Sequence, residues 1–184
     1  MERLSRSDIE QMLANGYDRS TIAQAEAWLE KCDRADELID LVRRAFAGVE
    51  LEDGVGLRES DGIDDYAGSE QLKQLRAADE HLDWQNITSE LLNRCHAAPS
   101  FLDAKGMRFH TPAFIISELR GEFIQDFLGR LIDGSYSATD FPKLLTAEQR
   151  NAIIECIRFY GSIEHYSYEP DDIAAGVSRF ADPK

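Results

Sequence analysis

Four carboxylates lie close together between Glu59 and Asp65, within the segment GLRESDGIDDYA. Carboxylate oxygens on a flexible loop are the ligands that calcium and magnesium prefer. The spacing does not follow the EF-hand template, in which acids at the first, third and fifth positions precede a glutamate at the twelfth. Like charges this close repel one another unless a cation, an arginine or a helix N-terminus compensates. The segment therefore predicts a cation site, internal pairing with arginine or a docking surface, and we favour the last two and assign no metal ion or cofactor.

The remaining polar candidates do not form a catalytic signature. His96 and His110 fall short of a zinc site, which needs three or four converging ligands. The sequence contains no G-x-S-x-G motif, phosphate-binding glycine loop or dinucleotide-binding fingerprint, so no catalytic residue is assigned. The candidate binding residues are Glu59, Asp61, Asp64, Asp65, Tyr66, Trp84, Arg108 and His110.

The stretch from Ser100 to Glu122 is expected to position several of these side chains. Its first part, 100–110, predicts a β-hairpin, because Asp103-Ala104-Lys105-Gly106 has turn chemistry with Gly106 at positive φ. Arg108 and His110 would share one face of the second strand. Thr111 would then cap an apolar helix that begins at Pro112 and is buried on most sides.

Helical periodicity dominates the rest of the chain. Apolar residues three and four apart predict a long helix from Thr21 to Phe46, which Gly48 ends. Thr146 and Gln149 form a capping box that opens another helix. The glycine-rich stretch 48–69 is predicted to be a long loop. We therefore predict a mainly α fold with one small β-hairpin: a single compact domain, residues 34–184, preceded by an N-terminal helical arm, residues 1–33.

Composition narrows the functional classes. The chain has 184 residues with 35 acids and 20 bases, a net charge of −15, which argues against nucleic acid or an anionic membrane as the main partner. No apolar run approaches the roughly 18 residues that a membrane-spanning helix needs. The three cysteines, Cys32, Cys95 and Cys156, are widely spaced and odd in number. They are expected to be reduced core residues of a cytoplasmic protein.

Three segments in order resemble an uncharacterised bacterial family, a domain of unknown function. They are a tryptophan segment at Trp84, a Ser-Phe-x-x-x-x-Gly-x-Arg-Phe-x-x-Pro-Ala-Phe block from Ser100 to Phe114, and the Leu-Thr-x-Glu-Gln-Arg start from Leu145 to Arg150. The resemblance covers roughly residues 35–160 and leaves the arm outside. One departure is Thr111, where many relatives carry leucine. The resemblance implies no activity.

Together these features favour a cytosolic binding or regulatory protein whose working surface is the acidic loop 53–66 with the hairpin 100–110. The alternative is a hydrolase-like enzyme that uses the carboxylate cluster, with a divalent cation and His110 as assistants. A protein partner is expected for the acidic surface. Assembly of identical copies through the N-terminal arm is a further prediction.

Overall fold

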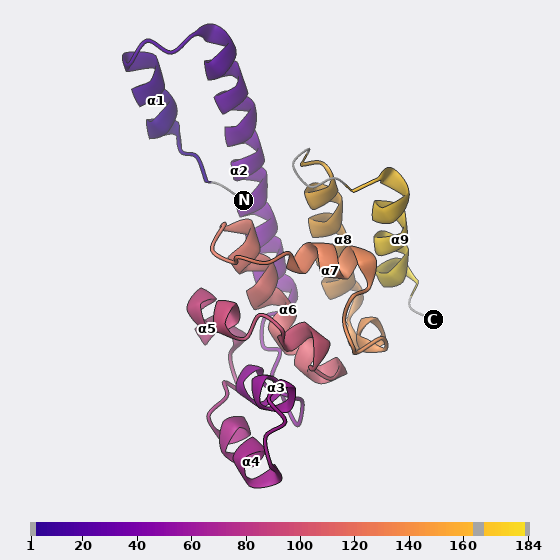
Figure 1. Cartoon of the computed structure of the whole chain (residues 1–184). Helices are drawn as coiled ribbons and strands as arrows, with labels where there is room; N and C mark the ends of the chain where they lie inside the picture. The colour runs from indigo at the N-terminus through magenta and orange to yellow at the C-terminus, as the bar shows by residue number, and fades with distance from the viewer. Residues whose placement is uncertain (1–2, 164–167, 183–184) are drawn as a thin grey trace.

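The computed structural model describes residues 3–163 and 168–182, and every regular element within these ranges is a helix (Figure 1). The α-helices are α1 (Arg6–Ala14), α2 (Arg19–Ala45), α3 (Leu57–Asp64), α4 (Ser69–Ala77), α5 (Ser89–Arg94), α6 (Ala104–Leu119), α7 (Phe127–Asp133), α8 (Ala147–Gly161) and α9 (Pro170–Ala181). Short 3-10 turns lie at η1 (Trp84–Asn86), η2 (Ala98–Ser100) and η3 (Phe141–Leu144). The prediction of helices is confirmed, and the prediction of a β-hairpin is wrong.

The hairpin prediction failed because Asp103 begins a helix instead of a turn. Its carboxylate accepts a hydrogen bond from the Gly106 amide at 2.8 Å, which is the bond of a helix N-cap, so residues 104–110 form the first two turns of α6. Thr111 is a buried interior residue and no cap. Pro112 stands inside the helix, where it cannot donate a hydrogen bond to the Arg108 carbonyl.

Helix α6 is the centre of the fold. Every residue from Phe109 to Leu119 is buried, and α2, α5, α7, η1 and η3 contact the helix. The Phe114 ring stacks on Phe127 with centroids 4.7 Å apart and meets the edge of Phe123 at 5.2 Å. The sequence prediction that this apolar helix is buried on most sides is confirmed.

The glycine-rich stretch that was predicted to be a loop contains helix α3. Its N-cap, Gly56, has no side chain to cap the helix, and the carboxylate of Asp79, just after α4, takes over that role. Asp79 accepts hydrogen bonds from the amides of Arg58 at 2.8 Å and Glu59 at 3.1 Å. A Cβ atom on Gly56 would lie 2.2 Å from this carboxylate. Because Gly56 has no Cβ atom, the Asp79 carboxylate can come close enough to cap the start of α3.

Helix α1 and the first half of α2 extend away from the other helices as an antiparallel pair (Figure 1). Helix α2 is continuous through residue 33, so the predicted arm boundary falls inside a helix. Arg3 donates a hydrogen bond to Asp36 at 2.6 Å, and Lys31 donates one to the Ser162 carbonyl at 2.9 Å. Both contacts tie the arm to the second half of α2 and to the end of α8.

Deletion of residues 1–33 is expected to leave a folded protein with a lower free energy of unfolding. The buried side chains of α2 that enter the main core, from Ala35 to Val42, all lie beyond the deletion. Urea denaturation followed by circular dichroism would measure the loss of stability, and size-exclusion chromatography would show whether the arm supports oligomers. A truncated chain with no cooperative unfolding transition would make the arm part of the core.

Candidate functional site

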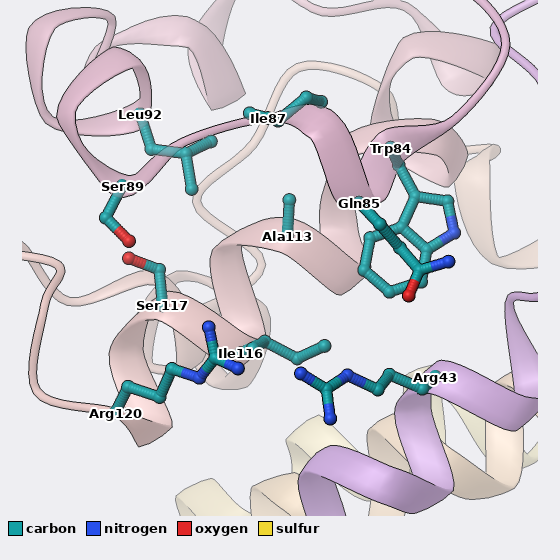
Figure 2. A pocket seen from close by; sticks show the side chains of 10 residues that line it. All are labelled: Arg43, Trp84, Gln85, Ile87, Ser89, Leu92, Ala113, Ile116, Ser117 and Arg120. Atoms are coloured by element: carbon teal, nitrogen blue, oxygen red, sulfur yellow. The ribbon is translucent and has the colours of Figure 1, made fainter.

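A cleft of about 150 Å³ lies between α6, the segment from η1 to α5, and the last turn of α2 (Figure 2). One face of α6 forms its floor, since Ala113, Ile116, Ser117 and Arg120 follow one another at helical spacings of three and four residues. The opposite wall comes from the η1–α5 segment, and Arg43 closes the third side. The lining residues are Arg43, Trp84, Gln85, Ile87, Ser89, Leu92, Ala113, Ile116, Ser117 and Arg120.

Two arginines give the cleft its charge. Arg43 lies in the last turn of α2 and Arg120 is the C-cap of α6. Figure 2 shows both guanidinium groups directed toward the part of the cleft where the Ile116 side chain lies. Arg43 reaches Asp40 at 3.4 Å, and no ion pair joins Arg120 to any other residue in the described ranges. No acid among the described residues lines the cleft, although the chain carries 35 acidic residues.

Trp84 forms a fixed apolar wall. Its side chain is 3% exposed, and the indole N–H donates a hydrogen bond to the Phe46 carbonyl at 2.8 Å. The start of η1 is held by Asp83, whose carboxylate accepts a hydrogen bond from the Gln85 amide at 3.0 Å. Since both the ring and its backbone are anchored, the indole is positioned before any ligand arrives.

The Ser117 hydroxyl is buried and has no hydrogen-bond partner among the described residues. The residue is only 3% exposed and its Oγ faces the cleft and the Ser89 side chain (Figure 2). Ser89 already donates its proton to Glu122 at 2.6 Å. A buried hydroxyl without a partner loses stabilisation that a ligand oxygen could restore.

The loop after α6 is fastened to α5, which keeps the walls of the cleft in place. The Asn93 amide group donates to the Glu122 carbonyl at 2.8 Å and accepts from the Ile124 amide at 2.9 Å. With the bond from Ser89 to Glu122, three hydrogen bonds join α5 to this loop. These bonds hold α5, which carries Ser89, against the end of α6, which carries Ser117 and Arg120.

The predicted acidic site is dispersed over α3. Glu59 is buried and pairs with Arg76 at 2.7 Å, as expected for internal pairing. Asp64 and Asp65 are exposed at the end of the helix, and Asp61 is half-buried. Tyr66, which follows them, is 96% exposed. These carboxylates therefore do not converge on one point.

Arg108 and His110 lie on α6, and within the described residues neither pairs with any of these four carboxylates. Arg108 pairs with Glu52 at 2.6 Å, and Lys105 bonds to both Glu52 and Asp53. His110 is fully buried, with Nδ1 2.7 Å from the Gly106 carbonyl, and burial lowers its pKa to about 4. A neutral, enclosed imidazole cannot serve a carboxylate cluster at the surface.

Of the eight residues predicted to bind, only Trp84 lines the cleft. Sequence reasoning missed Arg43, Ser117 and Arg120. One signal was available: Ser117 and Arg120 are polar residues at a spacing of three, directly after the apolar run from Ala113 to Ile116. Nothing in the sequence connected them to Arg43. Within residues 3–163 and 168–182, no three side chains of His, Cys, Asp or Glu form a group that could hold a metal ion.

A second polar cluster, in which Glu118 and Tyr160 are buried and Asp126 is exposed, joins α6 to α7, α8 and the segment before α9. The Glu118 carboxyl is 4% exposed and accepts a hydrogen bond from the Leu128 amide at 2.8 Å. Asp126 accepts hydrogen bonds from the hydroxyls of Tyr160 and Tyr168, each at 2.9 Å. Burial, with a smaller effect of the Asp126 charge, raises the pKa of Glu118 to about 8. This cluster connects the C-terminal half of α6 to α7 and α8.

Comparison with known families gives a match that covers most of the helices described above. Residues 34–178, from the middle of α2 to α9, match the family of unknown function DUF6714. The chain belongs to this family. Every cleft residue lies inside the matched range, and the arm up to residue 33 lies outside it. Neither the curated proteins nor the solved structures contain a match to the chain.

Two further features of the DUF6714 chain concern membrane-spanning helices and the cysteine side chains. No helix in the described part is both long enough and apolar enough to cross a membrane. Cys32, Cys95 and Cys156 are all buried and form no disulfide among the described residues. Burial raises the pKa values of Cys95 and Cys156, which disfavours the reactive thiolate form.

Proposed function

We propose that this member of the DUF6714 family is a cytosolic binding protein that holds a small anion in the cleft between Arg43 and Arg120. The observation that carries the proposal is the lining of the cleft, which includes two arginines and, among the described residues, no acid, in a protein of net charge −15. Guanidinium groups form strong, directional hydrogen bonds with carboxylate and phosphate oxygens. The Ser117 hydroxyl, which has no partner among the described residues, supplies a further donor on the same face of α6.

The structure around the two arginines supports binding of an anion within the cleft more than general attraction of anions to the protein surface. The anchored Trp84 ring, together with Ala113 and Ile116 of the floor, excludes water from one side of the cleft, and ion pairs are stronger where water is excluded. The net negative charge of the chain opposes the approach of anions in general. Selective binding therefore depends on the local hydrogen-bond donors of Arg43, Arg120 and Ser117.

The test is thermal unfolding with acetate, benzoate or inorganic phosphate at constant ionic strength. At a hundredfold excess over Kd, a ligand stabilises the folded state by about 2.7 kcal/mol, which corresponds to a rise of several degrees in Tm. We expect at least one of these anions to produce the rise. Arg43→Gln and Arg120→Gln should each abolish it.

Arg19→Gln is the matched control, because Arg19 is exposed at the start of α2 and the substitution changes the net charge by the same amount. This variant should retain the full rise in Tm. An equal rise in all three variants would show that the anion acts elsewhere on the protein, and the proposed function would be wrong.

A second candidate is a docking surface for a protein partner at the acidic end of α3. The observation in its favour is Tyr66, which is 96% exposed and has a φ of 57°, beside the exposed carboxylates of Asp64 and Asp65. A large exposed aromatic side chain among charges is typical of interaction surfaces. This second candidate uses neither Arg108, which pairs with Glu52, nor His110, which is buried.

A further inference from the structure

We infer that the anion held in the cleft is inorganic phosphate, with one protonated oxygen turned toward Ser89. This inference rests on the proposed anion site and names the anion. The groups that the cleft presents to a ligand are mainly polar, and the side chains that are exposed or half-buried there include Arg43, Gln85, Ser89 and Arg120. Four apolar lining residues are at most 7% exposed: Trp84, Leu92, Ala113 and Ile116. A ligand therefore contacts hydrogen-bonding groups and needs no apolar body.

The hydrogen-bond donors reach the cleft from separate segments of the chain. Arg120 comes from the end of α6, Arg43 from the last turn of α2 and Gln85 from η1. The Gln85 side-chain amide has no hydrogen-bond partner among the described residues, so its N–H groups are available. The two oxygens of a carboxylate lie on one side of its carbon atom, whereas the four oxygens of a tetrahedral anion point in four directions. Donors on several sides therefore match a tetrahedral anion more completely than acetate.

The Ser89 hydroxyl distinguishes among tetrahedral anions. It lies on the wall of the cleft, on the side of Ser117 (Figure 2), and donates its only proton to the Glu122 carboxylate at 2.6 Å. A carboxylate accepts hydrogen bonds and cannot donate one, so the direction of this bond is fixed. The lone pairs of Ser89 Oγ remain free, and toward a ligand this oxygen is an acceptor.

Glu122 adds a negative charge behind Ser89. An anion oxygen without a proton would meet the lone pairs of Ser89 and, beyond them, this carboxylate, and both repel it. Hydrogen phosphate retains a P–O–H group at neutral pH and can donate to Ser89 at this point. Sulfate has no proton at neutral pH, and a phosphate monoester loses its last proton above a pKa of about 6. Inorganic phosphate is therefore the anion that satisfies both the arginines and Ser89.

Isothermal titration of the full chain at about pH 7.5 and constant ionic strength, with inorganic phosphate, sulfate, methyl phosphate and acetate, tests the inference. Phosphate is expected to bind at least about tenfold more tightly than each of the other three anions. It alone combines a donor for Ser89 with several oxygens that accept from Arg43 and Arg120.

Glu122→Gln should raise the affinity for sulfate and bring it within about threefold of the affinity for phosphate. The substitution removes the charge behind Ser89 and releases the hydroxyl proton, which can then be donated to the anion. A tighter binding of sulfate cannot result from damage to the fold. Glu10→Gln is the matched control, because it makes the same change of charge at an exposed position of α1 and should leave the preference for phosphate unchanged.

The outcomes separate this inference from the proposed function. If sulfate, methyl phosphate or acetate binds as tightly as phosphate and Arg120→Gln abolishes the binding, the anion site stands and the inferred anion is wrong. If sulfate remains at least about tenfold weaker than phosphate in Glu122→Gln, Ser89 and Glu122 do not select the anion and the inference is wrong. If phosphate binds equally to the wild type and to the Arg43→Gln and Arg120→Gln variants, the arginine site itself is wrong. If none of the four anions binds at millimolar concentrations, both are wrong.

Discussion

Gly106→Val is expected to lower the free energy of unfolding by about 1–3 kcal/mol, the usual cost of forcing extra atoms into a packed site. A Cβ atom at this position would lie 2.4 Å from the Val55 carbonyl oxygen, and a backbone atom cannot move aside as a flexible side chain can. The Asp103 carboxylate accepts a hydrogen bond from the Val55 amide at 3.0 Å, which holds the two segments together. Urea denaturation would measure the change.

Gly68→Val is the matched control for this substitution. Gly68 is the N-cap of α4 in an extended conformation, and a Cβ atom added there would have no described atom within 4 Å. The same change at this position should cost less than about 1 kcal/mol, the range of an N-cap preference. Equal losses at both glycines would show that the Val55 carbonyl does not limit the size of residue 106.

Glu118→Gln is expected to remove a pH dependence of stability that the wild type shows between about pH 6.5 and 8. The folded-state pKa of Glu118 is raised to about 8 from an ordinary value of 4.5, so in this range the folded protein holds a proton that the unfolded chain has lost. The free energy of unfolding therefore falls as the pH rises. One group can contribute up to about 1.4 kcal/mol per pH unit, or at most about 2 kcal/mol over this window.

The pH window begins above the range in which most of the titration of His110 affects stability. Burial lowers its pKa from 6.5 to about 4, so its contribution to stability increases mainly as the pH rises from 4 to 6.5 and increases by only about 0.4 kcal/mol above that range, in the direction opposite to the effect of Glu118. Denaturation at about pH 6.5, 7.25 and 8 would compare the wild type with Glu118→Gln and with the exposed Glu10→Gln. A wild-type stability that does not fall, or falls equally in Glu118→Gln, would contradict a protonated Glu118.

Helices with complete local signals were predictable from the sequence. The capping box of Thr146 and Gln149 is present at the start of α8, with the Gln149 amide donating to Thr146 at 3.2 Å. Gly48 adopts a φ of 72° after α2, as its role as a helix stop requires. In both places the residues that determine the conformation are sequence neighbours, so no distant contact can reverse the result.

The errors arose where one residue type serves two local structures. An aspartate followed three residues later by glycine suits a tight turn and also a helix N-cap, and Asp103 is the N-cap. The closeness of Gly106 to Val55, a residue far away in the sequence, explains why this position is glycine although it lies in a helix. Helix α3 likewise depends on Asp79, which no local pattern around Gly56 reveals.

The cleft could be predicted only in part. Trp84 was a candidate, and the spacing of Ser117 and Arg120 on α6 was readable. Arg43 reaches the same cleft because α2 packs on α6, and this packing depends on side chains distributed over both helices. A site made from three separate segments has no sequence motif of its own, which is why the prediction centred on the more obvious cluster of acids.

The most direct test of the anion site is a titration of arginine-labelled protein with acetate, benzoate or inorganic phosphate, whichever raises the Tm most, observed through the Nε–H signals of the arginine side chains in ¹⁵N-edited NMR spectra. The signals of Arg43 and Arg120, assigned with the two Gln variants, are expected to shift and to saturate with one common Kd. The signal of the exposed Arg19 should stay in place. Shifts of similar size at all arginines, or no saturable shift at Arg43 and Arg120, would contradict the account.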